Sequence, residues 1–190
     1  GESYHLQDRD LHDTSTMAIS PHVVEFFSKY ASGLKTLSPK AKDFLYFSAI
    51  MMHAAEASLL DDNGNLRKDA NGNDVTVTWE KHANTGGIKW VCSDPNIKPY
   101  RNKNRDIFPE KQLLAAHQLW KEKPLCVDHN SSSVDGIRGL IVDTYYDAPY
   151  KRVIALCCVD KKNYPELARK VATGLCRDVS MGTAVSQATC

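Results

Sequence analysis

The chain has 190 residues, of which 42% are hydrophobic and 25% charged, which is the composition of an ordinary folded domain with one substantial core. Its 24 basic residues nearly balance 23 acidic ones, and a net charge of +1 gives no general attraction to nucleic acid or to an anionic membrane. The sequence contains no apolar run of about 18 residues, which excludes a membrane-spanning helix.

The six cysteines also indicate the redox compartment of the protein. Most of them lie within apolar runs, where a free thiol packs as a small hydrophobic side chain, and this usage favours a reducing cytoplasm. The adjacent Cys157 and Cys158 are predicted to lie on a strand, with one side chain pointing inward and the other outward.

The first part of the chain predicts helices. Apolar residues at three-to-four-residue spacing predict a helix within residues 20–33. A second helix is predicted from Ser38, as N-cap, and Pro39 to about Leu60, so that the two would form a hairpin. With the turns that follow, residues 1–74 are predicted to be a helical extension with a turn-rich linker, which we interpret as a docking or family-specific addition.

Two clusters of Asp, Asn and Gly, at residues 61–65 and 69–74, indicate tight turns. The spacing of their acidic residues to the glycine does not fit a calcium-binding EF-hand loop. Both clusters are therefore interpreted as surface turns, and no metal site is expected.

Residues 75–190 predict a mixture of strands and helices. Because two of the strands are joined by a short turn at residues 147–149, they form a hairpin, and a hairpin excludes a purely parallel sheet. The sequence therefore predicts an α+β domain with a mostly antiparallel sheet. Strands are expected at residues 75–79, 87–92, 125–128, 136–146, 151–159 and around Ser180, and helices at residues 109–120 and 165–173, the last closed by Gly174.

A serine and a histidine in this part are candidates for chemistry. A serine hydroxyl becomes a nucleophile when a base, usually histidine, lies within hydrogen-bonding reach. His129 follows a short apolar run and precedes a polar loop, so it is expected at a strand end, whereas His53 and His117 are more easily core residues. Gly182, two residues after Ser180, would let a substrate backbone approach closely. Taken alone, these features leave both a catalytic pair and a chance coincidence open.

The order of these features over residues 87–185 matches a known pattern. The strand at 87–92 is followed by a loop (100–109) leading into a helix, then by the strand that ends at His129. The hairpin at 136–159 and a helix precede Val179-Ser180-Met181-Gly182. This arrangement resembles the prohead (head-maturation) proteases of tailed bacteriophages, especially those of T4-like and giant phages, which are similar in fold to herpesvirus assemblins.

The resemblance implies a small β-barrel-like sheet flanked by helices for residues 75–190, with Ser180 as nucleophile and His129 as general base. It implies no cofactor. The third catalytic residue of the family generally lies on a strand after the serine, and only ten residues follow Ser180. Asp128 is a poor substitute because neighbouring strand side chains point to opposite faces. This leaves Asp135, Asp143 and Asp178 as possible partners of the histidine.

The function implied by the resemblance is that of a serine endopeptidase that cleaves phage scaffold and capsid proteins during prohead maturation. It would act in the host cytoplasm, inside the assembling prohead, as a homo-oligomer or head-shell component, without a membrane partner. The basic residues of the loop from Lys98 to Arg105 are interpreted as solvated, so nucleic acid is not an expected partner. The alternative is a non-catalytic structural component of the virion that keeps the protease fold.

Overall fold

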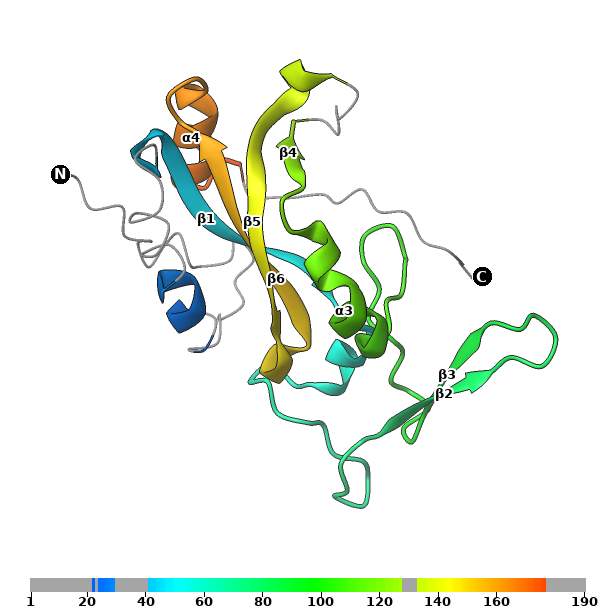
Figure 1. Ribbon diagram of the computed structural model, residues 1–190. Helices are drawn as coiled ribbons and strands as arrows, with labels where there is room; N and C mark the ends of the chain where they lie inside the picture. Colours follow the sequence, from blue (N-terminus) through cyan, green and yellow to red (C-terminus); the bar gives the residue numbers. More distant parts are fainter. Residues whose placement is uncertain (1–21, 23, 30–40, 128–132, 177–190) are drawn as a thin grey trace.

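The computed structural model describes residues 22, 24–29, 41–127 and 133–176 (Figure 1). They form an α+β structure with a four-stranded sheet and a separate two-stranded sheet. The strands are β1 (Phe44–His53), β2 (Val77–Lys81), β3 (Ile88–Cys92), β4 (Pro124–Cys126), β5 (Ile137–Asp147) and β6 (Arg152–Asp160). The helices are α3 (Glu110–Ala116), α4 (Pro165–Ala172) and the short 3-10 helices η1 (Ala41–Asp43), η2 (Ala55–Leu59), η3 (His117–Trp120), η4 (Val134–Gly136) and η5 (Ala148–Tyr150).

The four-stranded sheet has the order β1-β6-β5-β4, and every neighbouring pair is antiparallel. Its centre is the predicted β5–β6 hairpin, which turns through η5 and Lys151, a residue in the left-handed region with φ 51°. Strands β1 and β4 end the order and do not pair with each other, so within the described residues the sheet is open. The antiparallel α+β prediction is confirmed, and the expectation of a barrel-like closure is wrong for this part of the chain.

The predicted helix over residues 38–60 is also wrong. Residues 44–53 form β1, which pairs with β6 from Phe44 opposite Asp160 to His53 opposite Arg152. In a continuous apolar run, periodicity does not separate a buried strand from a buried helix, and aromatic residues favour a pleated surface. The pairing with β6 then decides the outcome, and helical structure is confined to η1 and η2. Residues 44–53 therefore belong to the main sheet and not to a helical extension.

Side chains of β6 alternate between the two faces of this sheet, and both faces are covered. On one face lies the helix that contains residues 24–29, and its Phe27 is completely buried. This helix confirms the described part of the prediction for residues 20–33. Its cluster consists of Phe27, Val142, Ile154, Leu156 and Cys158.

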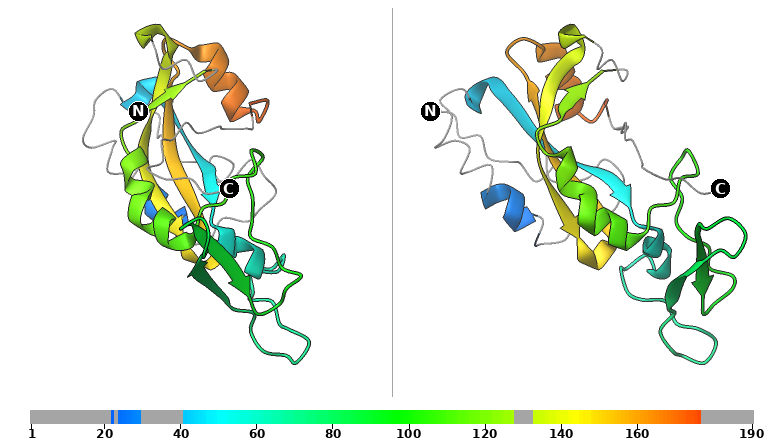
Figure 2. Two further views of the ribbon diagram at one scale, coloured as in Figure 1. Left: turned by 90° about the vertical axis from the view of Figure 1, so that its right-hand side faces the viewer. Right: turned by 45° about the vertical axis from the view of Figure 1, so that its right-hand side comes forward.

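The opposite face is covered by α3 and η3, as Figure 2 shows from two sides. Leu113 of α3 packs with Val153, and Trp120 of η3 packs against Cys157 and its neighbours. Cys157 and Cys158 therefore lie on opposite faces, as predicted, but both are buried. The expected outward side chain is covered because helices lie on both sides of the sheet.

Strands β2 and β3 form a hairpin that projects away from the main sheet (Figures 1 and 2). Both strands were predicted from the sequence. Trp79 and Trp90 lie opposite each other with their rings edge to face at 5.3 Å. The indole of Trp79 donates to the Glu56 carboxylate at 2.6 Å, and that of Trp90 donates to the carbonyl oxygen of Ile97 at 3.2 Å. These bonds attach the hairpin to η2 and to the loop after β3.

The remaining predicted helices are confirmed. Residues 110–120 form α3 followed by η3, and α4 ends where Gly174 adopts a φ of 73° and donates its N–H to the carbonyl oxygen of Val171. In the part of the chain that the structure describes, every helix is too short or too polar to cross a bilayer.

Candidate active site

The predicted catalytic pair, Ser180 and His129, lies outside the described residues, as do Asp128 and Asp178. The structure describes the elements that lead to each of them. It also describes two of the possible orienting carboxylates, Asp135 and Asp143, and the two histidines that the sequence assigns to the core. These parts bound the two segments that contain the predicted pair, and they include other groups that could take part in chemistry.

The strand that precedes His129 is β4, at the end of the sheet. β4 pairs with β5 through Pro124 opposite Leu140 and Leu125 opposite Gly139, and the register shifts before Cys126. Among the described strands, none pairs with the outer edge of β4. His129 follows Cys126 by three positions in the sequence. The segment that contains the histidine therefore starts at a sheet edge whose backbone groups could pair with a further strand.

The segment that precedes Ser180 is α4 and its C-terminal turn. α4 packs against β6 and β1, and its Ala168 is buried. After Gly174, the backbone N–H of Cys176 donates to the carbonyl oxygen of Lys170 at 3.0 Å. Four positions separate Cys176 from Ser180 in the sequence. The chain is thus held against α4 until shortly before the predicted nucleophile.

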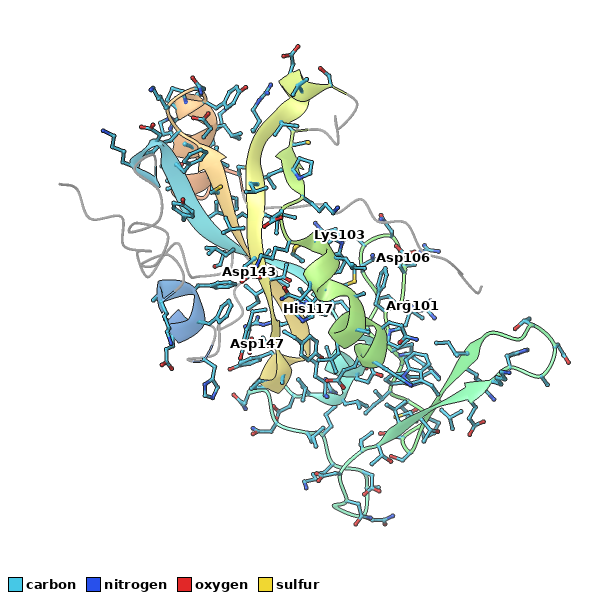
Figure 3. All side chains as sticks on the ribbon, in the orientation of Figure 1. Arg101, Lys103, Asp106, His117, Asp143 and Asp147 are labelled. Atoms are coloured by element: carbon cyan, nitrogen blue, oxygen red, sulfur yellow. The ribbon has the colours of Figure 1, made fainter. Side chains whose placement is uncertain are left out.

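The two described carboxylates differ in environment. Asp143 is buried within β5, and its carboxylate accepts the backbone N–H of Thr144 at 2.8 Å. Its charge acts on His117, where it opposes the lowering of the pKa by burial (Figure 3). Asp135 lies in η4, just before β5, and its backbone N–H donates to the Ser133 hydroxyl at 3.1 Å. Asp143 therefore interacts with His117, while Asp135 lies at an exposed end of the sheet.

His117 lies within hydrogen-bonding distance of a hydroxyl group, and its geometry fits a structural role. Its Nδ1 lies 2.9 Å from the Thr144 hydroxyl, which itself donates to the carbonyl oxygen of His117 at 2.9 Å. When the hydroxyl proton is given to the carbonyl oxygen, Nδ1 is the donor of the first bond. Gln118 also donates to the carbonyl oxygen of Thr144 at 2.8 Å. Thr144 is only 1% exposed, so no substrate reaches its hydroxyl, and the pair joins η3 to β5.

A buried polar network that the sequence analysis did not identify connects the hairpin to the sheet. Glu56 is 6% exposed, and its carboxylate accepts the indole N–H of Trp79 and, at 2.8 Å, the backbone N–H of Glu110. Glu110 in turn accepts the Tyr146 hydroxyl at 2.7 Å and the Lys151 ammonium at 2.8 Å. Burial, followed by the bond to Glu110, raises the pKa of Tyr146. The one feature of the sequence that indicates this network is Glu56, a single glutamate among alanines.

A shallow, open depression lies beside this network. The network itself lacks the properties of an active site. The depression is lined by Glu56, Glu110, Lys111, Leu114 and Ala115. Both carboxylates already accept two hydrogen bonds from the protein, so neither is poised as a free general base. We interpret the network as the joint that holds the β2–β3 hairpin against the sheet.

At the β5–β6 turn, Arg152 and Asp147 form an ion pair at 2.9 Å, and both side chains are completely buried. The Arg152 guanidinium lies over the Tyr150 ring, 4.6 Å from its centroid. On the neighbouring strand, His53 lies opposite Arg152 and contacts the Tyr100 ring at 4.8 Å. Its Nε2 is buried, with no hydrogen-bond partner in the described structure, and burial and then Arg152 lower the pKa of His53 to about 4. The histidine is therefore held neutral as part of the core.

The described residues contain no group of three or more His, Cys, Asp or Glu side chains that could hold a metal ion. No protein-family model, curated protein or solved structure matches the chain.

Proposed function

We propose that the chain is a serine endopeptidase of the phage prohead type, with Ser180 as nucleophile and His129 as general base. The proposal rests on the resemblance in sequence. The observation that supports it is the order of elements: β3, a loop, α3, β4, the β5–β6 hairpin and α4 follow one another where the resemblance requires them. Six elements in the expected order are a stronger basis than the two residue types alone.

The position of β4 gives further support. His129 follows this strand by three positions, and a strand around Ser180 could pair with the edge of β4 that no described strand occupies, since antiparallel pairing needs only free backbone groups. Such pairing would bring residues that are fifty-one positions apart in the sequence onto one sheet. Of the possible orienting carboxylates, Asp143 already accepts a hydrogen bond from Thr144 and interacts electrostatically with His117. This favours Asp135 or Asp178 as the partner of His129.

In the proposed mechanism His129 removes the proton of the Ser180 hydroxyl as its oxygen attacks the scissile carbonyl carbon. The same histidine then donates this proton to the leaving amine, and an acyl-enzyme forms. Water, deprotonated by His129, attacks the ester and releases the second product. The substrates would be scaffold and capsid proteins within the assembling prohead, an assignment that depends on the resemblance alone.

Labelling with a fluorophosphonate, followed by peptide mapping, tests the proposal. The wild-type chain is expected to carry one adduct at Ser180, and Ser180→Ala and His129→Ala are expected to lose it. His117→Ala is the matched histidine control and should keep the adduct, because His117 bonds a buried threonine. A folded wild-type chain that labels no better than Ser180→Ala would refute the catalytic role and favour the non-catalytic structural component.

A further inference from the structure

Two turns between η2 and β2 share the sequence pattern Asp-x-Asn-Gly-Asn. The first spans residues 61–65 and the second spans residues 69–73. Each contains an Asn-Gly step, at Asn63-Gly64 and Asn71-Gly72. Asn-Gly is the dipeptide in which an asparagine side chain is most readily attacked by the following backbone nitrogen, because glycine has no Cβ to hinder the approach.

The backbone of the two turns is nearly the same. In the first turn, Asp61 Oδ1 accepts the N–H groups of Asn63 and Asn65, both at 2.9 Å. The glycine has a φ of 79° and donates its N–H to the carbonyl oxygen of Asp61 at 3.0 Å. The bonds from Asn65 and Asn63 also lower the pKa of the Asp61 carboxyl.

In the second turn, Asp69 Oδ1 accepts the N–H groups of Asn71 and Asn73, at 2.8 and 2.9 Å. Gly72 has a φ of 82° and donates to the carbonyl oxygen of Asp69 at 3.0 Å. The backbone hydrogen bonds at the two Asn-Gly steps therefore match, whereas the residue before each asparagine, Asp62 or Ala70, and the packing around each turn differ.

The surroundings of the two glycines do differ. A Cβ placed on Gly64 would lie 3.1 Å from Cε1 of Tyr150, whose ring is itself covered by the Arg152 guanidinium. A Cβ placed on Gly72 would meet nothing within 4 Å. The first turn is thus packed on the end of the β5–β6 hairpin, while the second faces open space.

We propose that Asn71 is a site of spontaneous deamidation in the folded protein, and that Tyr150 protects the equivalent Asn63. The Gly72 backbone nitrogen bonds to Cγ of Asn71 and loses its proton, and the side-chain nitrogen leaves as ammonia. Water then opens the resulting cyclic imide at either carbonyl carbon and gives aspartate or isoaspartate. Both products add a negative charge beside Asp69, and isoaspartate also lengthens the backbone of the turn by one atom.

The reaction requires each glycine N–H to leave its hydrogen bond and turn toward the asparagine, which is a local opening of the turn. Opening the first turn also breaks the contact with Tyr150, and opening the second does not. Asn71 is therefore expected to convert about fivefold faster than Asn63 in the folded chain, which corresponds to roughly 1 kcal/mol in the free energy of local opening.

The test is an incubation of the intact chain in mildly alkaline buffer, with peptide mapping by mass spectrometry and chromatographic separation of isoaspartate. Asn65 and Asn73 are controls within the same turns, because Leu66 and Asp74 follow them instead of glycine. The same rates are measured in denaturant, where only the local sequence differs between the two steps. The Tyr150→Ala chain should raise the Asn63 rate toward that of Asn71.

Two results would overturn the proposal. One is a ratio of Asn71 to Asn63 rates that is the same in the folded and the denatured chain, since the fold would then protect neither turn selectively. The other is an Asn71 that converts in denaturant but stays intact in the folded chain, since the hydrogen bonds to Asp69 would then protect the exposed turn as well. The wild-type comparison decides the matter even if Tyr150→Ala does not fold.

Discussion

Acidification should destabilise this protein through His53. The ring lies opposite Arg152 and against Tyr100, and its buried Nε2 has no hydrogen-bond partner in the described structure. Protonation would place a second cation beside Arg152, whose charge is paired with Asp147. Burial and Arg152 thus lower the pKa of His53 from 6.5 to about 4. The substitution His53→Gln removes the titrating group and keeps a polar side chain of similar length.

The size of the effect follows from this shift. Between pH 6.5 and about pH 4 the unfolded chain binds a proton at His53 and the folded chain does not, so stability falls as the pH falls through this window. Its contribution is fully present above pH 6.5, and about 2 kcal/mol of it is lost by about pH 5. The loss approaches about 3 kcal/mol at pH 4.

Urea unfolding of the wild-type and His53→Gln chains at several pH values measures this contribution. The difference in unfolding free energy between the two should shrink by about 2 kcal/mol from neutral pH to about pH 5. His22→Gln, which changes an exposed histidine, is the matched control for replacing a histidine by glutamine. Parallel pH profiles for the wild-type and His53→Gln chains would refute the reasoning.

Three further substitutions or reagents test the packing. A Cβ on Gly139 would collide with the carbonyl oxygen of Cys158, so Gly139→Ala should separate β5 from β6 locally and cost about 3 kcal/mol in urea unfolding. A neutral result would mean that these strands are not so close. Phe27→Ala, at a completely buried ring, should cost about 3–5 kcal/mol, and a loss well below 1 kcal/mol would show that this helix does not cover the sheet. A thiol reagent should modify the exposed Cys176 in the folded chain. Burial raises the pKa values of Cys157 and Cys158 to about 12 and 11, so these two thiols should react only after unfolding. Equal reaction rates of the three cysteines in the folded chain would contradict the burial of Cys157 and Cys158.

Most of the second half of the fold could be predicted from local signals. Three local features each require a particular backbone conformation: the hairpin turn, the proline that begins α4 and the glycine that ends it. The structure has the hairpin and the helix at the predicted positions. The error at β1 has a different origin. The partner of that strand, β6, is about a hundred residues away in the sequence, and a local pattern carries no information about such pairing.

The sequence pattern also did not predict that both faces of the sheet are buried. The alternation of Cys157 and Cys158 predicts opposite faces, but whether a face is covered depends on Phe27 and Trp120, which come from other parts of the chain. The joint around Glu56 and Glu110 was missed for the same reason, since its four donors come from β2, α3, β5 and the turn between β5 and β6. For Ser180 and His129 the sequence provides residue types and order, and a local pattern carries no information about the distance between residues that are far apart in the chain.

The rate at which a fluorophosphonate acylates Ser180, measured as a function of pH, tests the catalytic claim most directly. If His129 is the general base, the rate at Ser180 rises as a single histidine loses its proton, and the rise is absent in His129→Ala. His117→Ala should keep the profile. A folded wild-type chain without an adduct at Ser180, or with a rate that His129→Ala leaves unchanged, would contradict the proposed serine endopeptidase.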